Sequence, residues 1–108
     1  MADAFKRIAA TKNRLFKYKC FWYMHQKAAT IFAQETPDAD DLLLAKALWA
    51  GQVKAEDVAR IVATNSTIGA AIDNGTAISE SDIEYVIVTD TAFHDLATAY
   101  KAAGLIGA

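Results

Sequence analysis

Residues 4–34 contain neither Gly nor Pro and consist largely of residues that favour helices. This uninterrupted stretch predicts one helix, which would be about 45 Å long at a rise of 1.5 Å per residue. Such a helix is long for a chain of 108 residues. We therefore expect the other elements to be shorter and to pack around it.

The first half of this predicted helix has a basic face. On a helical wheel its cations share one side, opposite Phe5, Ile8 and Leu15. These cations are Lys6, Arg7, Arg14 and Lys17. We expect them to face acidic groups of an adjacent molecule.

The second half of the predicted helix, after Tyr18, is apolar on most sides. Apolar residues take over the basic face, and Trp22 continues a second apolar row beside it. The residues that take over the basic face are Phe21, Met24, Ala28 and Phe32. A helix of this kind needs cover on most sides. A neighbouring subunit or the chain's own domain can supply that cover, and the sequence leaves both explanations open.

The composition indicates a single helical domain. Hydrophobic residues make up 54% of the chain, which is long enough for one modest core. One Pro and five Gly leave little material for the turns of an all-β fold. We predict an all-α fold over residues 1–108, in which three or four shorter helices pack around the long N-terminal one.

Capping signals place the shorter helices. Thr36 is the expected N-cap of the second helix, with Pro37 in the first helical position and Gly51 after the end. Asn65 separates the third helix from the fourth, and Asn74 closes the fourth. The predicted helices span residues 37–50, 54–64, 67–73 and 80–103.

The last predicted helix has the clearest start and stop signals. Ser79 suits its N-cap, and Gly104 suits the left-handed position after its end, with Leu105 in contact with Tyr100. Its interior, residues 85–89, is rich in β-branched residues and would predict a strand if it were taken alone. A helical stripe of apolar residues favours one continuous helix.

The sequence offers no complete catalytic, metal or nucleotide motif, so we expect neither an enzyme nor a cofactor. Asp90 and His94 lie four residues apart, a spacing that can orient an imidazole, but we interpret Asp90 as a structural or interface acid because no nucleophile accompanies the pair. Cys20 is interpreted as a buried small apolar residue and His25 as a packed or interfacial one. A metal site is not predicted.

No targeting segment and no uncharged stretch of about 20 residues is visible, so we expect no membrane span and a reducing cytoplasm as the default compartment. The net charge of −2 is split unevenly along the chain. Residues 1–34 carry seven Lys or Arg against one Asp, whereas residues 35–108 carry four against twelve Asp or Glu. Such asymmetry indicates an interaction, with another molecule or with a second copy.

Nucleic-acid binding is the alternative interpretation of the basic N-terminal segment. Lys12 and Lys19 lie close to the apolar row, and Phe16, Tyr18 and Tyr23 have rings that can stack on bases. Aromatic residues at helical spacing are more often core, and the acidic remainder of the chain would repel DNA. We therefore keep a small nucleic-acid-binding or regulatory module, with DNA contact through this helix, as the second hypothesis.

The layout of the chain resembles small helical virion proteins of tailed bacteriophages. The resemblance rests on three segments, MADAFKRIAATKNRLFKYKC, AKALWAGQVKAEDVARIVATNSTIGAAI and AISESDIEYVIVTDTAFHDLATAY. It implies a non-enzymatic part of the virion, at the head–tail neck in preference to the tail or the capsid surface. It also implies a homo-oligomeric ring that contacts other virion proteins and assembles in the host cytoplasm.

These observations together predict an interface on the N-terminal helix. Its centre is expected at Phe21, Trp22, Met24 and Phe32, because buried aromatic anchors near an interface centre carry most of the binding energy. The basic face and Asp90 are expected around it, since unlike charges on the two halves of identical chains favour head-to-tail contacts.

Overall fold

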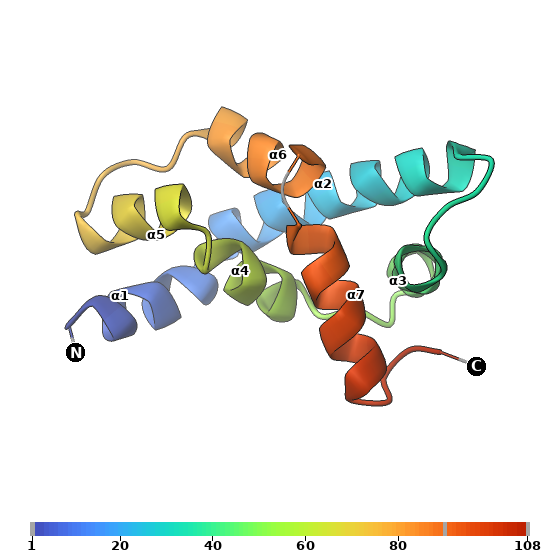
Figure 1. Cartoon of the computed structure of the whole chain (residues 1–108). Helices are drawn as coiled ribbons and strands as arrows, with labels where there is room; N and C mark the ends of the chain where they lie inside the picture. The colour runs from blue at the N-terminus through green and yellow to red at the C-terminus, as the bar shows by residue number, and fades with distance from the viewer. Residues whose placement is uncertain (1, 90, 108) are drawn as a thin grey trace.

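The computed structural model describes residues 2–89 and 91–107 and contains only helices in these ranges. The predicted all-α fold is confirmed for these residues. The helices are α1 Ala2–Thr11, α2 Arg14–Ala33, α3 Ala39–Trp49, α4 Ala55–Ala63, α5 Ser66–Asp73, α6 Glu80–Thr89 and α7 Ala92–Ala102 (Figure 1).

The predicted long N-terminal helix is wrong, because the chain breaks at Lys12 and Asn13 into α1 and α2. Asn13 has an extended backbone, and its side-chain oxygen accepts a hydrogen bond of 3.1 Å from the amide of Phe16. Asn competes in this way for backbone donors and favours N-caps over helix interiors. Thr11 closes the preceding turn by donating to the carbonyl of Ile8 at 2.7 Å.

Helix α2 is the longest of the described helices and contacts α3, α4 and α6. One side of it is buried against these neighbours. The buried residues on that side are Phe16, Cys20, Tyr23, Met24, Ala28 and Ile31. They join side chains from α3 to α7 in one hydrophobic cluster. The shorter helices thus pack on one side of α2, and its opposite side faces outward.

The predicted helix over residues 80–103 is also wrong, because α6 ends at Thr89 and α7 begins at Ala92. Asp90 lies outside the described residues. Helix α6 packs on α2, whereas α7 crosses toward α3 (Figure 1). Both helices have buried faces, which include Ile87 in α6 and Leu96 in α7. The change of direction lets each apolar face reach a different partner, which one straight helix would not allow.

The remaining boundaries follow local capping chemistry. The predicted positions of α4 and α5 are confirmed to within one residue at each end. Helix α3 begins later than predicted, because Asp38 and not Thr36 is its N-cap and accepts from the amides of Asp40 and Asp41. The Schellman ending of α7 is confirmed: the amide of Leu105 donates to the carbonyl of Tyr100 at 2.9 Å, next to Gly104 at φ 73°.

Candidate interaction surface

The outward side of α2 exposes large apolar side chains. Leu15 is 64% exposed, Tyr18 54%, Trp22 62% and Phe32 44%. Positions 15, 18, 22, 29 and 32 lie three, four or seven residues apart, so they form one stripe on the helix, and Ala29 at the fifth position is also exposed. We call Leu15, Tyr18, Trp22, Ala29 and Phe32 the α2 stripe. It lies opposite the buried face, and no described helix covers it.

His25 connects the α2 stripe to the end of α3. Its Nδ1 lies 2.8 Å from the carbonyl oxygen of Phe21, and its Nε2 lies 3.3 Å from that of Leu48. The imidazole meets the rings of Phe21 and Trp49 edge to face, at centroid distances of 4.6 and 5.7 Å. Trp49 is 61% exposed and widens the apolar surface. His25 is thus packed within the chain, which is one of its two interpretations, and an interfacial role stays a prediction.

The four residues predicted for the interface centre have different environments. Trp22 and Phe32 are exposed, as an unpartnered interface requires. Phe21 is half-buried against the core. Met24 is fully buried, so its prediction as an interface residue is wrong. It lies on the same side of α2 as Cys20 and Ala28, where α3, α4 and α6 pack.

Two of the four predicted basic residues contact Asp73 of the same chain, Arg7 through the carboxylate and Lys6 through the backbone carbonyl. The Nε and Nη2 atoms of Arg7 donate to the two carboxylate oxygens of Asp73 at 3.0 and 2.6 Å. Lys6 donates to the backbone carbonyl of Asp73 at 2.8 Å. The guanidinium of Arg7 lowers the pKa of the Asp73 carboxyl below its ordinary value. These contacts fasten α1 to α5, so Arg7 has its acidic partner within the chain and not in another copy as expected.

The basic residues around the start of α2 are different. The guanidinium carbon of Arg14 lies 5.3 Å from the ring centre of Tyr18, a cation–π contact. Among the residues that the structure describes, none of the cations at this end of α2 has an ion pair. These cations are Lys12, Arg14, Lys17 and Lys19. Positive charge without an ion pair in the described ranges 2–89 and 91–107 therefore borders the N-terminal end of the α2 stripe.

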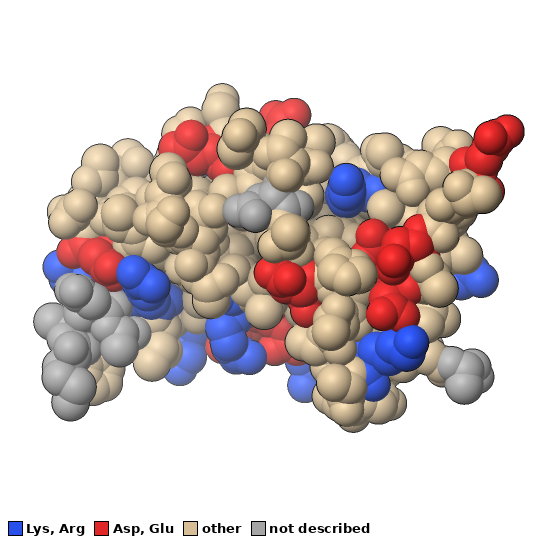
Figure 2. All heavy atoms as spheres, viewed as in Figure 1, with Lys and Arg blue, Asp and Glu red and all other residues tan. Residues whose placement is uncertain are grey.

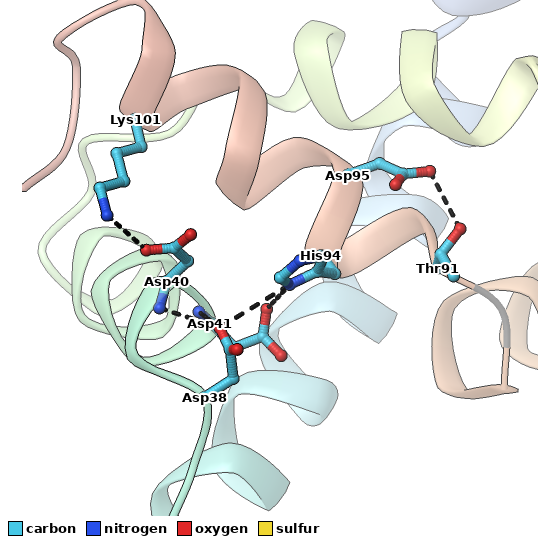
Figure 3. A network of polar contacts seen from close by, with 7 residues as sticks. All are labelled: Asp38, Asp40, Asp41, Thr91, His94, Asp95 and Lys101. Atoms are coloured by element: carbon cyan, nitrogen blue, oxygen red, sulfur yellow. Dashed lines mark hydrogen bonds and ion pairs between the residues drawn. The ribbon is translucent and has the colours of Figure 1, made fainter.

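A polar network joins α3 to α7 (Figure 3). His94 donates from Nδ1 to Asp41 at 2.8 Å and lies 3.8 Å from Asp38, and these carboxylates raise the pKa of His94. Lys101 donates to Asp40 at 2.8 Å. Figure 2 shows the acidic atoms gathered in this region. This network was not predicted from the sequence, because no local pattern relates residues of α3 to residues of α7.

Three side chains of this network carry ligand atoms within 4.8 Å of one another, namely Asp38, Asp41 and His94. One imidazole nitrogen and two carboxylate oxygens are donors that Zn²⁺ accepts in proteins. Here they make hydrogen bonds to protein groups: Asp38 caps α3 and Asp41 holds His94. A cation would have to displace the contact between His94 and Asp41.

Cys20 is fully buried, which confirms its interpretation as a small apolar core residue. Burial raises the pKa of its thiol to about 12. The thiolate is the reactive form of cysteine. Cys20 is therefore inert toward ordinary thiol reagents while the fold is intact.

A cleft of about 460 Å³ between α1 and α4 forms a second basic region at this end of the molecule. Arg7 and Arg60 line it together with Lys12 and Glu56. Arg60 is paired with Asp57 at 2.9 Å and with Glu56 at 3.6 Å. Both arginines are thus engaged with acids of the chain, which reduces the positive potential that a nucleic acid would meet there.

Comparison with protein-family models, with curated proteins and with solved structures gave no significant match. None of the helices in the described residues is both long enough and apolar enough to cross a membrane. The fold and the α2 stripe therefore define the class of molecule by physical criteria: a small all-α protein with an unpartnered apolar helix face.

Proposed function

We propose that this chain is a non-enzymatic structural subunit that works by associating with copies of itself. The observation that carries the proposal is the α2 stripe, whose large side chains face solvent on the longest described helix. Contiguous exposed apolar surface of this kind marks interaction sites in soluble proteins. Ordinary surface exposure of single hydrophobic residues would scatter them, and here they repeat along one helix face.

The particle in which the subunit acts is proposed from the sequence. The resemblance to small helical virion proteins of tailed bacteriophages suggests a virion, and we propose the head–tail neck as the position and a ring of identical copies as the assembly. The charge split supports contacts between unlike surfaces of identical chains. The cations beside the α2 stripe, which have no ion pair in the part of the chain that the structure describes, supply basic groups for contact with another copy.

Replacement of two stripe residues tests this function. Trp22→Ala combined with Phe32→Ala should weaken self-association by several kcal/mol, since each interface anchor contributes about 2 kcal/mol or more. Sedimentation velocity of the full chain should show the wild type as an oligomer and the double variant shifted toward monomer.

Tyr85→Ala is the matched control, because Tyr85 is an equally exposed aromatic (68%) on α6, outside the stripe. It should leave the assembly unchanged, and circular dichroism should show the helices of all variants intact. Equal loss of assembly in the Tyr85 variant would mean that exposed aromatics act without regard to the α2 stripe.

Nucleic-acid binding is the second candidate function, favoured by the cations at the start of α2 that lack ion pairs in the described residues. Tyr18 and Trp22 are exposed beside them and offer rings for stacking. A change in particle mass on addition of single-stranded or duplex DNA, reversed by salt, would support this function over self-assembly.

A further inference from the structure

The spacing along the α2 stripe matches a helix-pairing seam. Positions 15, 18, 22, 25, 29 and 32 alternate by three and four residues, the repeat with which two helices pack over several turns. From Leu15 to Phe32 the seam extends about 26 Å along the helix axis. The other described helices have at most 11 residues, so α2 itself is the only described helix that matches the seam in length.

We propose that the α2 stripe pairs with the same stripe of a second copy, with the two helices antiparallel about a two-fold axis. This inference rests on the proposed function, because it names the partner of the surface described there. The register that aligns both seams places Leu15 against the partner's Phe32. It also places Tyr18 against the partner's Ala29, and Trp22 against the partner's His25.

Charge selects the antiparallel orientation. Arg14, Lys17 and Lys19 lie toward the N-terminal end of α2, whereas Glu35 lies just beyond its C-terminal end. An antiparallel pair brings Arg14 near the partner's Glu35. A parallel pair would bring Arg14 near the partner's Lys19 and leave unlike charges at opposite ends. Like charges across a helix pair disfavour that alternative.

Side-chain size selects the same orientation. In the antiparallel register the exposed ring of Tyr18 meets the small side chain of the partner's Ala29. Trp22 meets the partner's His25, which is half-buried and flanked by Trp49. A parallel pair would oppose Trp22 to the partner's Trp22 and Ala29 to the partner's Ala29, which crowds one level and leaves a gap at another. Large against small fills the seam evenly.

A groove adjoins the N-terminal end of the α2 stripe at Leu15. It has a volume of about 290 Å³ and is lined by Leu15, Phe16, Ile78 and Ile83, with Lys19 at its edge. Its apolar walls would accept the ring of the partner's Phe32, which the antiparallel register places against Leu15. By symmetry each copy offers one Phe32 and one groove, which is the self-complementary pattern of a two-fold contact.

The pair has a consequence for larger assemblies. If a ring of head-to-tail contacts through another surface forms as well, the two-fold contact joins two such rings with dihedral symmetry, so the number of copies is even.

Disulfide trapping tests the orientation. Tyr18→Cys and Ala29→Cys are made as separate full-length proteins, each checked for association in the reduced state. Cys20 does not form a disulfide here, because its side chain is fully buried in the core. In the antiparallel pair, oxidation of a mixture should give a covalent dimer of the two variants. Either variant alone should give little, because its two introduced cysteines lie about 17 Å apart along the axis.

A charge swap gives an independent readout. Arg14→Glu and Glu35→Lys should each raise the dimer dissociation constant several-fold at low salt, and the double variant should recover most of the loss. This rescue requires Arg14 to face the partner's Glu35. A merely structural effect of either substitution would add in the double variant.

The outcomes separate the two proposals. Covalent dimers from the mixture only, together with charge-swap rescue, support the antiparallel pair. Efficient homodimers of each single variant would overturn it in favour of a parallel pair. A wild-type oligomer with no trapped disulfide in any sample would also overturn it, while leaving self-assembly intact. A wild-type chain that stays monomeric would refute the proposed function and this inference together.

Discussion

His94 and Asp41 are separated by 53 residues in the sequence, and yet Nδ1 of His94 lies 2.8 Å from Oδ1 of Asp41. The contact joins α7 to the first turn of α3, beside the pair of Lys101 and Asp40. It links the first turn of α7 to the first turn of α3, beside the apolar contacts between these helices. The packing of the last helix therefore depends in part on a titratable group.

The first prediction concerns pH. The carboxylate of Asp41, assisted by Asp38 and Asp40, raises the pKa of His94 above 6.5 in the folded state. The folded state then binds a proton that the unfolded state releases at lower pH, so the contribution to stability is fully present below about pH 6.5 and is lost as pH rises through the raised pKa. Because His94 is 48% exposed, we expect a loss of about 1 kcal/mol or less.

Urea unfolding at a series of pH values measures this loss. His94→Gln removes the titrating group. In this variant the unfolding free energy should change less than in the wild type between pH 5 and pH 9. If the wild type and the variant change in parallel from pH 5 to pH 9, the contact does not contribute to stability.

The second prediction concerns the attachment of α1. The two hydrogen bonds from Arg7 to Asp73 are its main polar link to α5, and Gly69 leaves room for the guanidinium, since a Cβ there would lie 2.9 Å from it. Arg7→Gln should therefore increase amide hydrogen exchange in α1 while leaving α7 unchanged. Lys12→Gln, without an ion pair in the described residues, should behave as the wild type. Equal exchange in both variants would show that apolar contacts alone hold α1.

The contact between Arg7 and Asp73 should also weaken at acidic pH. The pKa of Asp73 is lowered in the folded state, so its contribution to stability is present above the ordinary carboxyl pKa and is lost as pH falls through the lowered value. Exchange in α1 of the wild type should rise at acidic pH and approach that of the Arg7 variant.

The third prediction concerns the break between α1 and α2. Asn13→Ala removes the side chain that caps the amide of Phe16 and should lower the unfolding free energy by about 1 kcal/mol. Asn13→Asp keeps a capping oxygen and should stay near the wild-type value. Denaturant unfolding of the three proteins checks the order. A gain in stability for the alanine variant would indicate that the chain prefers the continuous helix.

The sequence predicted those elements whose ends are fixed by local chemistry. Gly104 and Leu105 form the ending that their spacing indicates, and Asn65 caps α5 with its side chain. These contacts involve residues close together in the chain, so they can be recognised without knowing the packing.

The two breaks were missed for different physical reasons. The break at Asn13 was not predicted, because the residues on both sides of it favour helices and no Gly or Pro interrupts them. The turn between α6 and α7 is required by packing, because α6 must cover α2 while α7 must reach α3. The amino acids at positions 89–92 contain no local signal that predicts this turn.

The candidate surface was predicted in part. Trp22 and Phe32 were placed at an interface from helical spacing, and both are exposed. Met24 was misplaced, because an apolar residue on a helix with two apolar sides can belong to either. Which side the other helices cover depends on contacts from α3, α4 and α6 that lie far away in the sequence.

The fourth prediction concerns salt. Cations at the start of α2, including Arg14 and Lys17, are expected to attract acidic groups of a neighbouring copy. Screening weakens such contacts, since the Debye length falls from about 10 Å at 0.1 M salt to about 3 Å at 1 M. Sedimentation velocity across this range should show weaker association at high salt. Association that is independent of ionic strength would leave apolar contact as its whole cause.

The fifth prediction tests self-assembly most directly. Native mass spectrometry of the wild-type chain, at a series of concentrations in low salt, measures how many copies associate. We predict particles of an even number of copies, with dimers as the smallest associated species. A chain that remains monomeric at the highest concentration, with its helices intact by circular dichroism, would contradict self-assembly through α2.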